Sequence, residues 1–414
     1  MVPVRDFGLL IEQGGRESGR SGAQAHQAGL DYALDYFSEG MDIWLADQRA
    51  GNRSSDGIDP SEFDLRETCI GIMGYAAFSE LADYRRPLTE SAISAIDSTA
   101  FITLYDKVLS TLMAASYENP EFVLSRIIRT IPSNRRSENL GGYTDFKTAG
   151  DGSGVAVPEG MPIPYAEFGD KLQETPRTSK YFKNVAVTRE AMFFNDGPQI
   201  QAKAQTIGDV LGKEKEYRHI DCFIGFVNNF TLNGTTYNTY QSASTWDNDH
   251  ANEITDVWKA MIAAEGKLVN GKNLTNGEQA VFRGKDLIYP FELKELLAPA
   301  LNATQFQQLT GANANRYVAS NPLVGFRPLQ HDMLKERIVT KGLANSTQAA
   351  KWWFLGDISK FMGYIENWKF DIIRAPANSH RSFTQHIVFE LQAGEMGATA
   401  ILEPQAMVRN KHAS

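Results

Sequence analysis

The chain has 414 residues, of which 42% are hydrophobic and 22% charged, values typical of folded globular proteins rather than disordered ones. Two cysteines, Cys69 and Cys222, exclude a disulfide framework and a cysteine-rich zinc site, and they fit a reducing compartment. The net charge of −9 argues against a surface that grips nucleic acid throughout, and no apolar run approaches the ~20 residues that cross a bilayer.

The N-terminal part predicts a mobile end followed by helices. Met1–Ser21 is rich in Gly, Arg and Glu and lacks a secretory signal, so we expect it to be mobile. Apolar residues between Ala25 and Phe37 recur at helical spacing. The polar stretch Asp47–Ser61 has the composition of a linker. Phe63–Tyr84 indicates a buried helix or a strand–turn pair, because its apolar period fits both.

The next segment predicts one or two helices over Thr89–Tyr117 and a strand or helix over Val123–Ile131. A local basic cluster begins within the second of these elements and continues after it; its members are Arg126, Arg129, Arg135 and Arg136. The cluster indicates contact with an acidic neighbour or with DNA, or else an ordinary solvated face, which is the commoner case.

The centre of the chain combines a loop, an extended hairpin and a long helix. Ala149–Tyr165 is rich in Gly and Pro without apolar periodicity and predicts an exposed loop. Phe168–Thr188 predicts the two arms of a twisted β-hairpin, with Pro176 between them. Asp196 as a possible N-cap and Pro198 at the first helical position then open the helix.

That helix is predicted to run from Pro198 to about Asn229, a length of about 48 Å. Its apolar residues form two rows, and neighbours within a row stand three, four or seven residues apart. Ile200 and Leu211 belong to the first row and Ile220 to the second. Glycines inside the segment weaken the prediction, since each costs ~1 kcal/mol against alanine.

The following region alternates strand and helix patterns, which indicates a mixed α/β domain. Asn233-Gly234 predicts a hairpin turn, and Asp256–Gly266 predicts a helix that ends at Gly266. Asp286–Pro290 has the composition of a buried strand, and a helix should run from Pro290 to about Ala298, stopped by Pro299. Further strands are expected at Arg316–Ser320, Leu323–Leu329, Lys351–Leu355 and Lys369–Ile373.

The C-terminal part predicts two antiparallel strands, Thr384–Gln392 and Thr399–Leu402, joined across Gly394 and Gly397. They would pair against strands near the long hairpin.

The sequence predicts no catalytic residue, no cofactor site and no metal site. The seven histidines lack a recognised metal spacing, and His380 with His386 is the nearest approach to one. Gly150–Gly154 (GDGSG) is followed by no helix that could bind a phosphate, so it predicts a flexible loop. Cys222 is expected to be a small core residue. The acid pairs Glu214 with Glu216 and Asp247 with Asp249 are expected to be solvated.

Four stretches resemble the major capsid proteins of tailed bacteriophages with the Hong Kong 97 fold. EGMPIPYAEFGDK (Glu159–Lys171) resembles the outgoing arm of their extended loop, and KYFKNVAVTREAMFFND (Lys180–Asp196) resembles the return into their spine helix. GEMGATAILEPQAMV (Gly394–Val408) resembles the last strand pair of their peripheral domain, and Ser98–Ile128 resembles the N-terminal arm region. The resemblance spans roughly Ser98–Asn410.

The resemblance implies an α+β (mixed α/β) fold with the following parts: an N-terminal extension or arm at 1–97, arm helices entering the peripheral domain at 98–147, an extended β-hairpin loop at 148–190, the spine helix at 191–231, an axial domain at 232–374, and C-terminal strands of the peripheral domain at 375–414. Residues from Met1 to about Arg53 would be either a built-in scaffold that a protease removes or a permanent arm.

The implied function is structural, not enzymatic: copies assemble into pentamers and hexamers of an icosahedral shell around double-stranded DNA. The DNA would be held without sequence-specific binding, and no membrane or cofactor is implied. Scaffold, portal and decoration proteins are possible further partners. The protein would be assembled in the bacterial cytoplasm and end in the virion.

The resemblance also implies contact and hinge residues. Contacts between subunits are expected at Tyr165, Phe168, Lys171, Arg177, Lys180 and Lys183, and hinges at Gly150, Gly152, Gly154, Gly197 and Pro198. Some relatives join a loop lysine to a neighbour's asparagine, but ordinary ion pairs are the simpler expectation for these lysines. Two rival interpretations remain, an encapsulin-like compartment with the same fold and an unrelated α/β enzyme.

Overall fold

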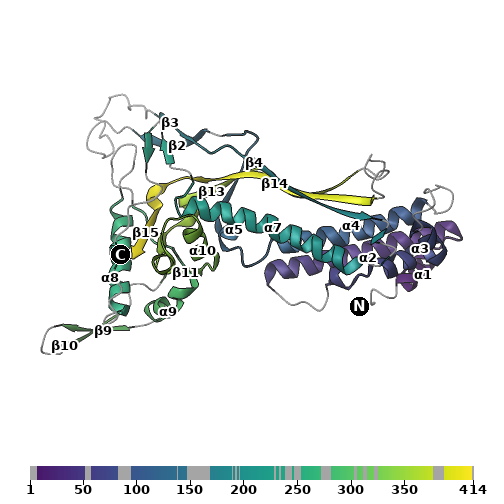
Figure 1. Cartoon of the computed structure of the whole chain (residues 1–414), viewed down its shortest axis with the longest axis horizontal. Helices are drawn as coiled ribbons and strands as arrows, with labels where there is room; N and C mark the ends of the chain where they lie inside the picture. Colours follow the sequence, from purple (N-terminus) through teal and green to yellow (C-terminus); the bar gives the residue numbers. More distant parts are fainter. Residues whose placement is uncertain are drawn as a thin grey trace, which may run out of the picture. The chain divides into compact units, whose positions relative to one another are not determined.

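The computed structural model forms two compact units, drawn in Figure 1. It describes residues 7–51, 57–82, 95–137, 139–146, 168–188, 190–191, 194, 196–227, 230–232, 235–237, 245–246, 253–271, 281–302, 305–310, 315–320, 325–375 and 387–412. The first unit comprises Met1–Phe122, Lys180–Lys215 and Trp368–Met396; the second comprises Val123–Ser179, Glu216–Asn367 and Gly397–Ser414.

Helices dominate the first unit, and Figure 1 shows four of them side by side. They are α1 (Phe7–Glu17), α2 (Ala23–Ala50), α3 (Leu65–Ala82) and α4 (Ala95–Tyr117), with a short 3-10 turn, η2 (Pro60–Glu62). Leu10, Phe37 and Phe101 are fully or almost fully buried in their common core. The expectation that Met1–Ser21 is mobile was wrong for Phe7–Glu17, because the apolar face of α1 packs on the other helices. The N-terminal extension or arm at 1–97 stays a prediction.

The α1–α2 pair is a tight antiparallel hairpin that depends on glycine. A Cβ at Gly29 would stand 2.0 Å from the Ile11 carbonyl oxygen, and one at Gly15 would stand 2.9 Å from the Ala25 carbonyl oxygen. Since a side chain cannot fit at such distances, glycine allows the two backbones to approach closely.

The central helix, α7, spans Gly197–Phe223, about 40 Å at 1.5 Å per residue. Its predicted start is confirmed, and Asp196 supplies the carbonyl that accepts the Ile200 N–H at 3.1 Å. The helix ends six residues before the predicted Asn229, because Gly225 takes a left-handed conformation with φ of 76°. α7, β13 and β14 contribute residues to both units, and so does β4 (Ser179–Thr188) through its first residue.

A four-stranded sheet has the order β1-β13-β14-β4. Its strands are β1 (Arg129–Pro132), β13 (Met362–Arg374), β14 (Ile387–Ile401) and β4 (Ser179–Thr188), and β1 runs parallel to β13. The prediction of two C-terminal strands joined across Gly394 and Gly397 was wrong, because β14 continues through both. These glycines are needed for packing: a Cβ at Gly394 would stand 2.2 Å from the Phe182 ring, and one at Gly397 would stand 2.3 Å from the Tyr364 hydroxyl.

The predicted hairpin also has different arms from those expected. β3 (Phe168–Glu174) pairs antiparallel with β2 (Asn139–Phe146), whereas β4 belongs to the sheet of β13 and β14. The prediction that Phe168–Thr188 supplies both arms was therefore wrong. The expected outgoing arm at Glu159–Lys171 instead contains the start of the returning strand.

Two small antiparallel pairs lie in the second unit. β5 (Phe230–Leu232) pairs with β6 (Thr235–Tyr237), in the sheet order β2-β3-β5-β6, so the hairpin predicted at Asn233-Gly234 is confirmed by its flanking strands. β9 (Gln305–Thr310) pairs with β10 (Asn315–Ser320).

A five-stranded mixed sheet carries the core of the second unit, in the order β11-β8-β12-β15-β7. Its strands are β11 (Arg327–Gln330), β8 (Asp286–Tyr289), β12 (Trp353–Gly356), β15 (Met407–His412) and β7 (Thr245–Trp246). β15, which lies inside the predicted segment 375–414, pairs with β12 and β7 of this sheet, and the assignment of 375–414 to the peripheral domain stays a prediction. Burial of all four residues of β8 matches the expectation for that strand.

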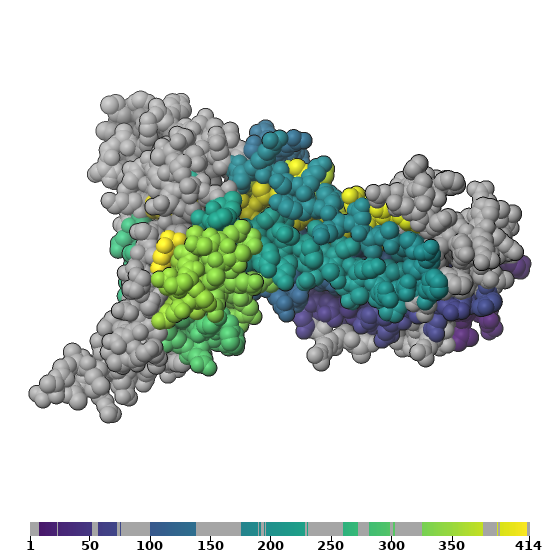
Figure 2. Space-filling view, viewed as in Figure 1, coloured from purple at the N-terminus to yellow at the C-terminus, as the bar shows by residue number. Residues whose placement is uncertain are grey.

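Helices cover this sheet with two clusters of buried side chains. They are α8 (Glu253–Val269), α9 (Lys294–Asn302), α10 (Met333–Thr340), α11 (Ser346–Ala349), α12 (Ile358–Phe361) and α5 (Val123–Ile127), with 3-10 turns η3 (Phe291–Leu293) and η4 (Pro404–Ala406). In Figure 2, α9 (green) and α10 (yellow-green) lie on the face of the molecule turned to the viewer. Two predicted ends were wrong: α8 continues past Gly266, and α9 continues past Pro299.

Gly208→Ala should destabilise the protein by ~1–3 kcal/mol, because the added methyl would stand 2.2 Å from the Met113 carbonyl oxygen of α4. The matched control is Gly266→Ala in α8, where no atom lies within 4 Å; it should stabilise the helix by ~0.5–1 kcal/mol. Urea unfolding of both variants measures the difference. Equal effects of the two substitutions would contradict close packing between α7 and α4.

Candidate functional site

The predicted contact residues are distributed over two sheets rather than along one hairpin. Phe168 and Lys171 lie in β3, opposite Phe146 and Gly142 of β2. Tyr165 lies outside the described residues, as do the hinge candidates Gly150, Gly152 and Gly154.

The other three contact candidates follow one another along the chain. Arg177 is exposed in the turn before β4, and Lys180 and Lys183 are exposed on β4 itself. The Lys180 ammonium lies 4.4 Å from the centroid of the Trp368 ring, in cation–π contact, and Trp368 is 50% exposed. Phe182 meets the same ring edge to face at 6.4 Å. This half-exposed aromatic group was not predicted from the sequence.

The hinge candidates Gly197 and Pro198 occupy the start of α7. Gly197 is buried, and a Cβ there would stand 2.9 Å from the Leu65 Cβ of α3, whereas Pro198 is exposed. Close packing explains the glycine, and a hinge at this position stays a prediction.

A buried carboxylate, Glu216 of α7, joins three segments of the second unit. It accepts the backbone N–H groups of Leu124 and Ser125 at 2.8 and 2.9 Å and the Ser125 hydroxyl at 2.6 Å. The His331 Nε2 lies 2.8 Å from the same carboxylate. Glu216 is fully buried, so the expectation that it is solvated was wrong, although its predicted companion Glu214 is exposed.

The pKa of Glu216 reflects this environment. Burial by itself raises the pKa, but the hydrogen bond and charge of His331, together with His219 and Ser125, lower it to about 2. A second buried histidine, His219, shares a hydrogen bond of 2.7 Å with the Thr399 hydroxyl. The carboxylate therefore remains charged at neutral pH and holds the start of α5 on α7.

Further buried acids are matched inside each unit. In the first unit Glu395 accepts a hydrogen bond from the Tyr117 hydroxyl, while the Lys215 ammonium lies 3.3 Å from Glu395 and 2.9 Å from the Tyr117 oxygen. In the second unit Asp221 accepts two hydrogen bonds from Arg337, at 2.6 and 2.7 Å. These pairs are structural, because each acid is enclosed by its own partners.

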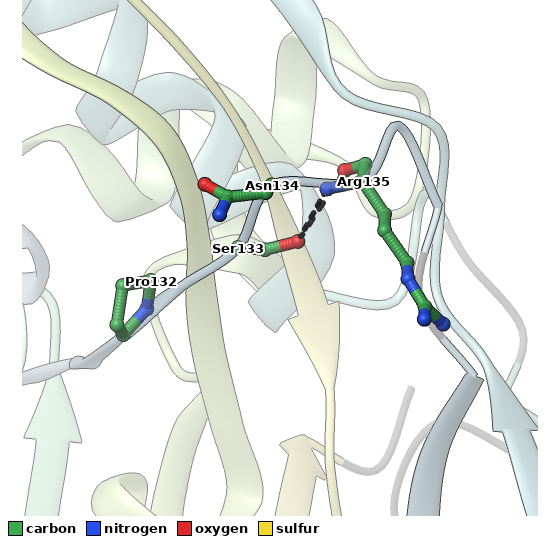
Figure 3. A pocket seen from close by; sticks show the side chains of 4 residues that line it. All are labelled: Pro132, Ser133, Asn134 and Arg135. Atoms are coloured by element: carbon green, nitrogen blue, oxygen red, sulfur yellow. Dashed lines mark hydrogen bonds between the residues drawn. The ribbon is translucent and has the colours of Figure 1, made fainter.

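A hollow at the end of β1 is lined by Pro132, Ser133, Asn134 and Arg135 (Figure 3). The Ser133 hydroxyl accepts the Arg135 backbone N–H at 3.1 Å, and the Arg135 side chain points away from Pro132 and Asn134. Asn367 donates its amide to the carbonyl oxygens of both Ser133 and Arg135. The Ser133 and Asn367 side chains thus hold the backbone of the turn, and the Arg135 side chain is left at the surface.

Among the described residues, no group of histidine, cysteine and acidic side chains is suited to hold a metal ion. No helix in that part of the chain is long and apolar enough to span a bilayer. Cys222 is buried in the core as expected, and His380, His386, Asp247 and Asp249 lie outside the described residues.

A sequence profile described as phage capsid protein matches residues 173–410, more than half of the chain, including α7 and most strands of both main sheets. The chain belongs to the phage capsid protein family. The identification predicted from the sequence is confirmed, as is the mixed α/β class, and the encapsulin-like alternative is not favoured.

Solved structures similar to this capsid protein include one from Mycobacterium phage Bobi, with 11% identity, a TM-score of 0.40 and coverage of 70% of this chain and 90% of that one. The capsid of cyanophage P-SCSP1u has 13% identity and a TM-score of 0.40, with coverage of 69% of this chain and 86% of that one. The mature capsid of bacteriophage PhiM1 has 9% identity and a TM-score of 0.41, with coverage of 70% of this chain and 87% of that one. No protein with a curated description matches the sequence. Because these scores are low, the assignment depends on the sequence profile.

Glu216→Gln should destabilise the capsid protein by about 3 kcal/mol at pH 7, since the lowered pKa of the carboxylate favours the folded state. This contribution is present above the unfolded pKa of about 4.5 and is lost as the pH falls toward 2. Urea midpoints of the natural chain and the variant should therefore converge at acid pH.

The control for this measurement is Glu214→Gln on the exposed face of the same helix, with an expected change below ~0.5 kcal/mol. A stability difference for Glu216→Gln that stays constant from pH 7 to acid pH would contradict the role given to the charged carboxylate.

Proposed function

We propose that this chain is the major capsid protein of a tailed bacteriophage, with a fold of the Hong Kong 97 type. Copies assemble into pentamers and hexamers of an icosahedral shell that encloses double-stranded DNA. The family match over residues 173–410 carries this proposal, because it covers α7 and the strands that surround it. The role is structural rather than enzymatic, and the protein is located in the virion after assembly in the bacterial cytoplasm.

The structural elements suggest how the subunits are joined. The pair β2–β3 and residues 147–167 between its strands correspond to the extended loop, so the loop starts before the expected residue 148. α7 corresponds to the spine helix, and most of 232–374 to the axial domain. The loop reaches a neighbouring copy through Tyr165, Phe168, Lys171, Arg177, Lys180 and Lys183, and its base bends at Gly150, Gly152, Gly154 and Gly197-Pro198. Scaffold, portal and decoration proteins are candidate further partners.

We also propose that α1 and α2 are retained in the mature shell rather than removed as a built-in scaffold. Leu30, Phe37 and Met41 of α2 are fully or nearly fully buried in the core that α4 shares. Removing them would expose this core to water at ~25 cal/mol per Å² of apolar surface.

Retention predicts that intact-mass measurement of purified particles gives the mass of a chain that still contains α1 and α2. A deletion of residues 1–50 should give insoluble or protease-sensitive protein, because Phe101 and its neighbours lose their cover. Particles whose chains begin after Ala50 would contradict retention.

Assembly itself is tested by expressing the full chain alone and examining it by electron microscopy and sedimentation. The proposal predicts closed shells or ring-shaped capsomers, since most intersubunit contacts in such a shell are between identical chains. A monomer or dimer that persists at high concentration and with added scaffold would overturn the proposed function. Empty shells would support the phage assignment, whereas shells that enclose a host enzyme would favour the encapsulin-like alternative.

A further inference from the structure

A surface of arginines lies on the second unit, around the turn that follows β1. It consists of Arg129, Arg135, Arg136 and Arg177, which we call the arginine surface; all four side chains are exposed. The Thr178 N–H and hydroxyl both donate to the Arg136 carbonyl oxygen, at 2.9 and 3.3 Å. This contact brings the turn of Arg177 against the turn of Arg135 and Arg136, although the two are about forty residues apart in sequence.

The guanidinium groups of the arginine surface form no ion pair or hydrogen bond with any described residue. Other arginines of the same unit do: Arg327 binds Asp286, and Arg337 binds Asp221 through two hydrogen bonds. Arg135, Arg136 and Arg177 are held on one pair of turns, and Arg129 lies at the start of β1. Like charges held together in this way repel each other, and the repulsion is relieved when carboxylates or phosphates approach.

A complementary surface exists on the same chain, in the first unit. Asp31, Asp35 and Glu39 stand four residues apart on α2, so they form one row along the helix, and all three are exposed. We call them the acidic row. Within the described part of the chain none of the three has a cationic partner, whereas the next acid along α2, Asp42, pairs with Lys107 of α4 at 2.6 Å.

The acidic row is unfavourable for an isolated α2, because like charges four residues apart destabilise a helix by ~0.2–0.5 kcal/mol per pair. The opposite face of α2 supplies Leu30, Ala33 and Phe37 to the core, so the row is directed to the solvent. The row spans about 12 Å along the helix axis, which is short enough for two turns carrying arginines to cover it.

From these two surfaces, and resting on the assembly proposed above, we propose that the arginine surface of one subunit binds the acidic row on α2 of a second copy of the chain. Arginine favours this partner because its planar guanidinium group binds carboxylates through paired hydrogen bonds. A net charge of −9 makes a neighbouring copy an acidic partner, and the same charge opposes binding of packaged DNA.

Charge reversal tests this interaction with the full chain. One variant carries Arg135→Glu, Arg136→Glu and Arg177→Glu; a second carries Asp31→Lys, Asp35→Lys and Glu39→Lys; a third combines all six and keeps the natural net charge. The matched control carries Lys203→Glu, Arg283→Glu and Lys360→Glu, exposed cations elsewhere on the chain. The assay measures the protein concentration at which shells or capsomers form, with thermal unfolding to verify folding.

Each three-residue reversal should raise the concentration required for assembly about tenfold or more, and the combined variant should return it to within a few-fold of the natural chain. The control should change it by less than about threefold, because exposed charges outside a contact contribute little. Assembly of the arginine variant at the natural concentration would overturn the proposal, as would failure of a folded combined variant to recover.

Two other outcomes are distinguishable. An arginine variant that assembles normally but retains less nucleic acid would identify DNA as the partner and overturn contact between copies. Failure of the natural chain and of the control to assemble would count against the proposed function itself, whereas failure of the reversals alone to have an effect would leave that function intact.

Discussion

The burial of α7 is the constraint on which the rest of the structure depends. Its first part gives Ile200, Ala204 and Leu211 to the core of one unit, and its last part gives Ile220 and Phe223 to a core of the other. A helix that packs one face against neighbours at close range has room only for glycine at some positions, such as Gly208 and Gly212. Every polar side chain on that buried face also needs partners. Glu216 satisfies the second condition through its own hydrogen bonds.

The charged residues of this capsid protein fall into two kinds. Buried acids such as Glu216, Glu395 and Asp286 are matched within their own unit, and their removal would leave uncompensated charges. Within the described parts of the chain, the arginine surface and the acidic row on α2 have no such matching. A monomeric protein would gain little from holding three cations on two adjoining turns, whereas a subunit of a shell can use them where copies meet.

Sequence periodicity was sufficient to predict most helices and strands. It failed where contacts between residues distant in sequence determine the structure. The start of α7, the strand β8 and the Asn233-Gly234 hairpin follow from local patterns of apolar, Pro and Gly residues. Gly394 was interpreted as a turn residue, but it is small because Phe182, about two hundred residues earlier, crosses it. Glu216 was read as solvated although it lies four residues before buried Ile220, a spacing that could have placed it on the inner face.

The division of the chain has a consequence for folding during synthesis. Leu10 near one end and Ala393 near the other belong to the same hydrophobic core, so this core cannot be completed until nearly the whole chain has left the ribosome. At about 5–20 residues per second, the helices made first wait roughly 20–80 s for the strand that closes their core. During that interval their apolar faces are open to other nascent chains, so the yield of folded subunits should depend on how crowded the nascent chains are as well as on the stability of the finished fold.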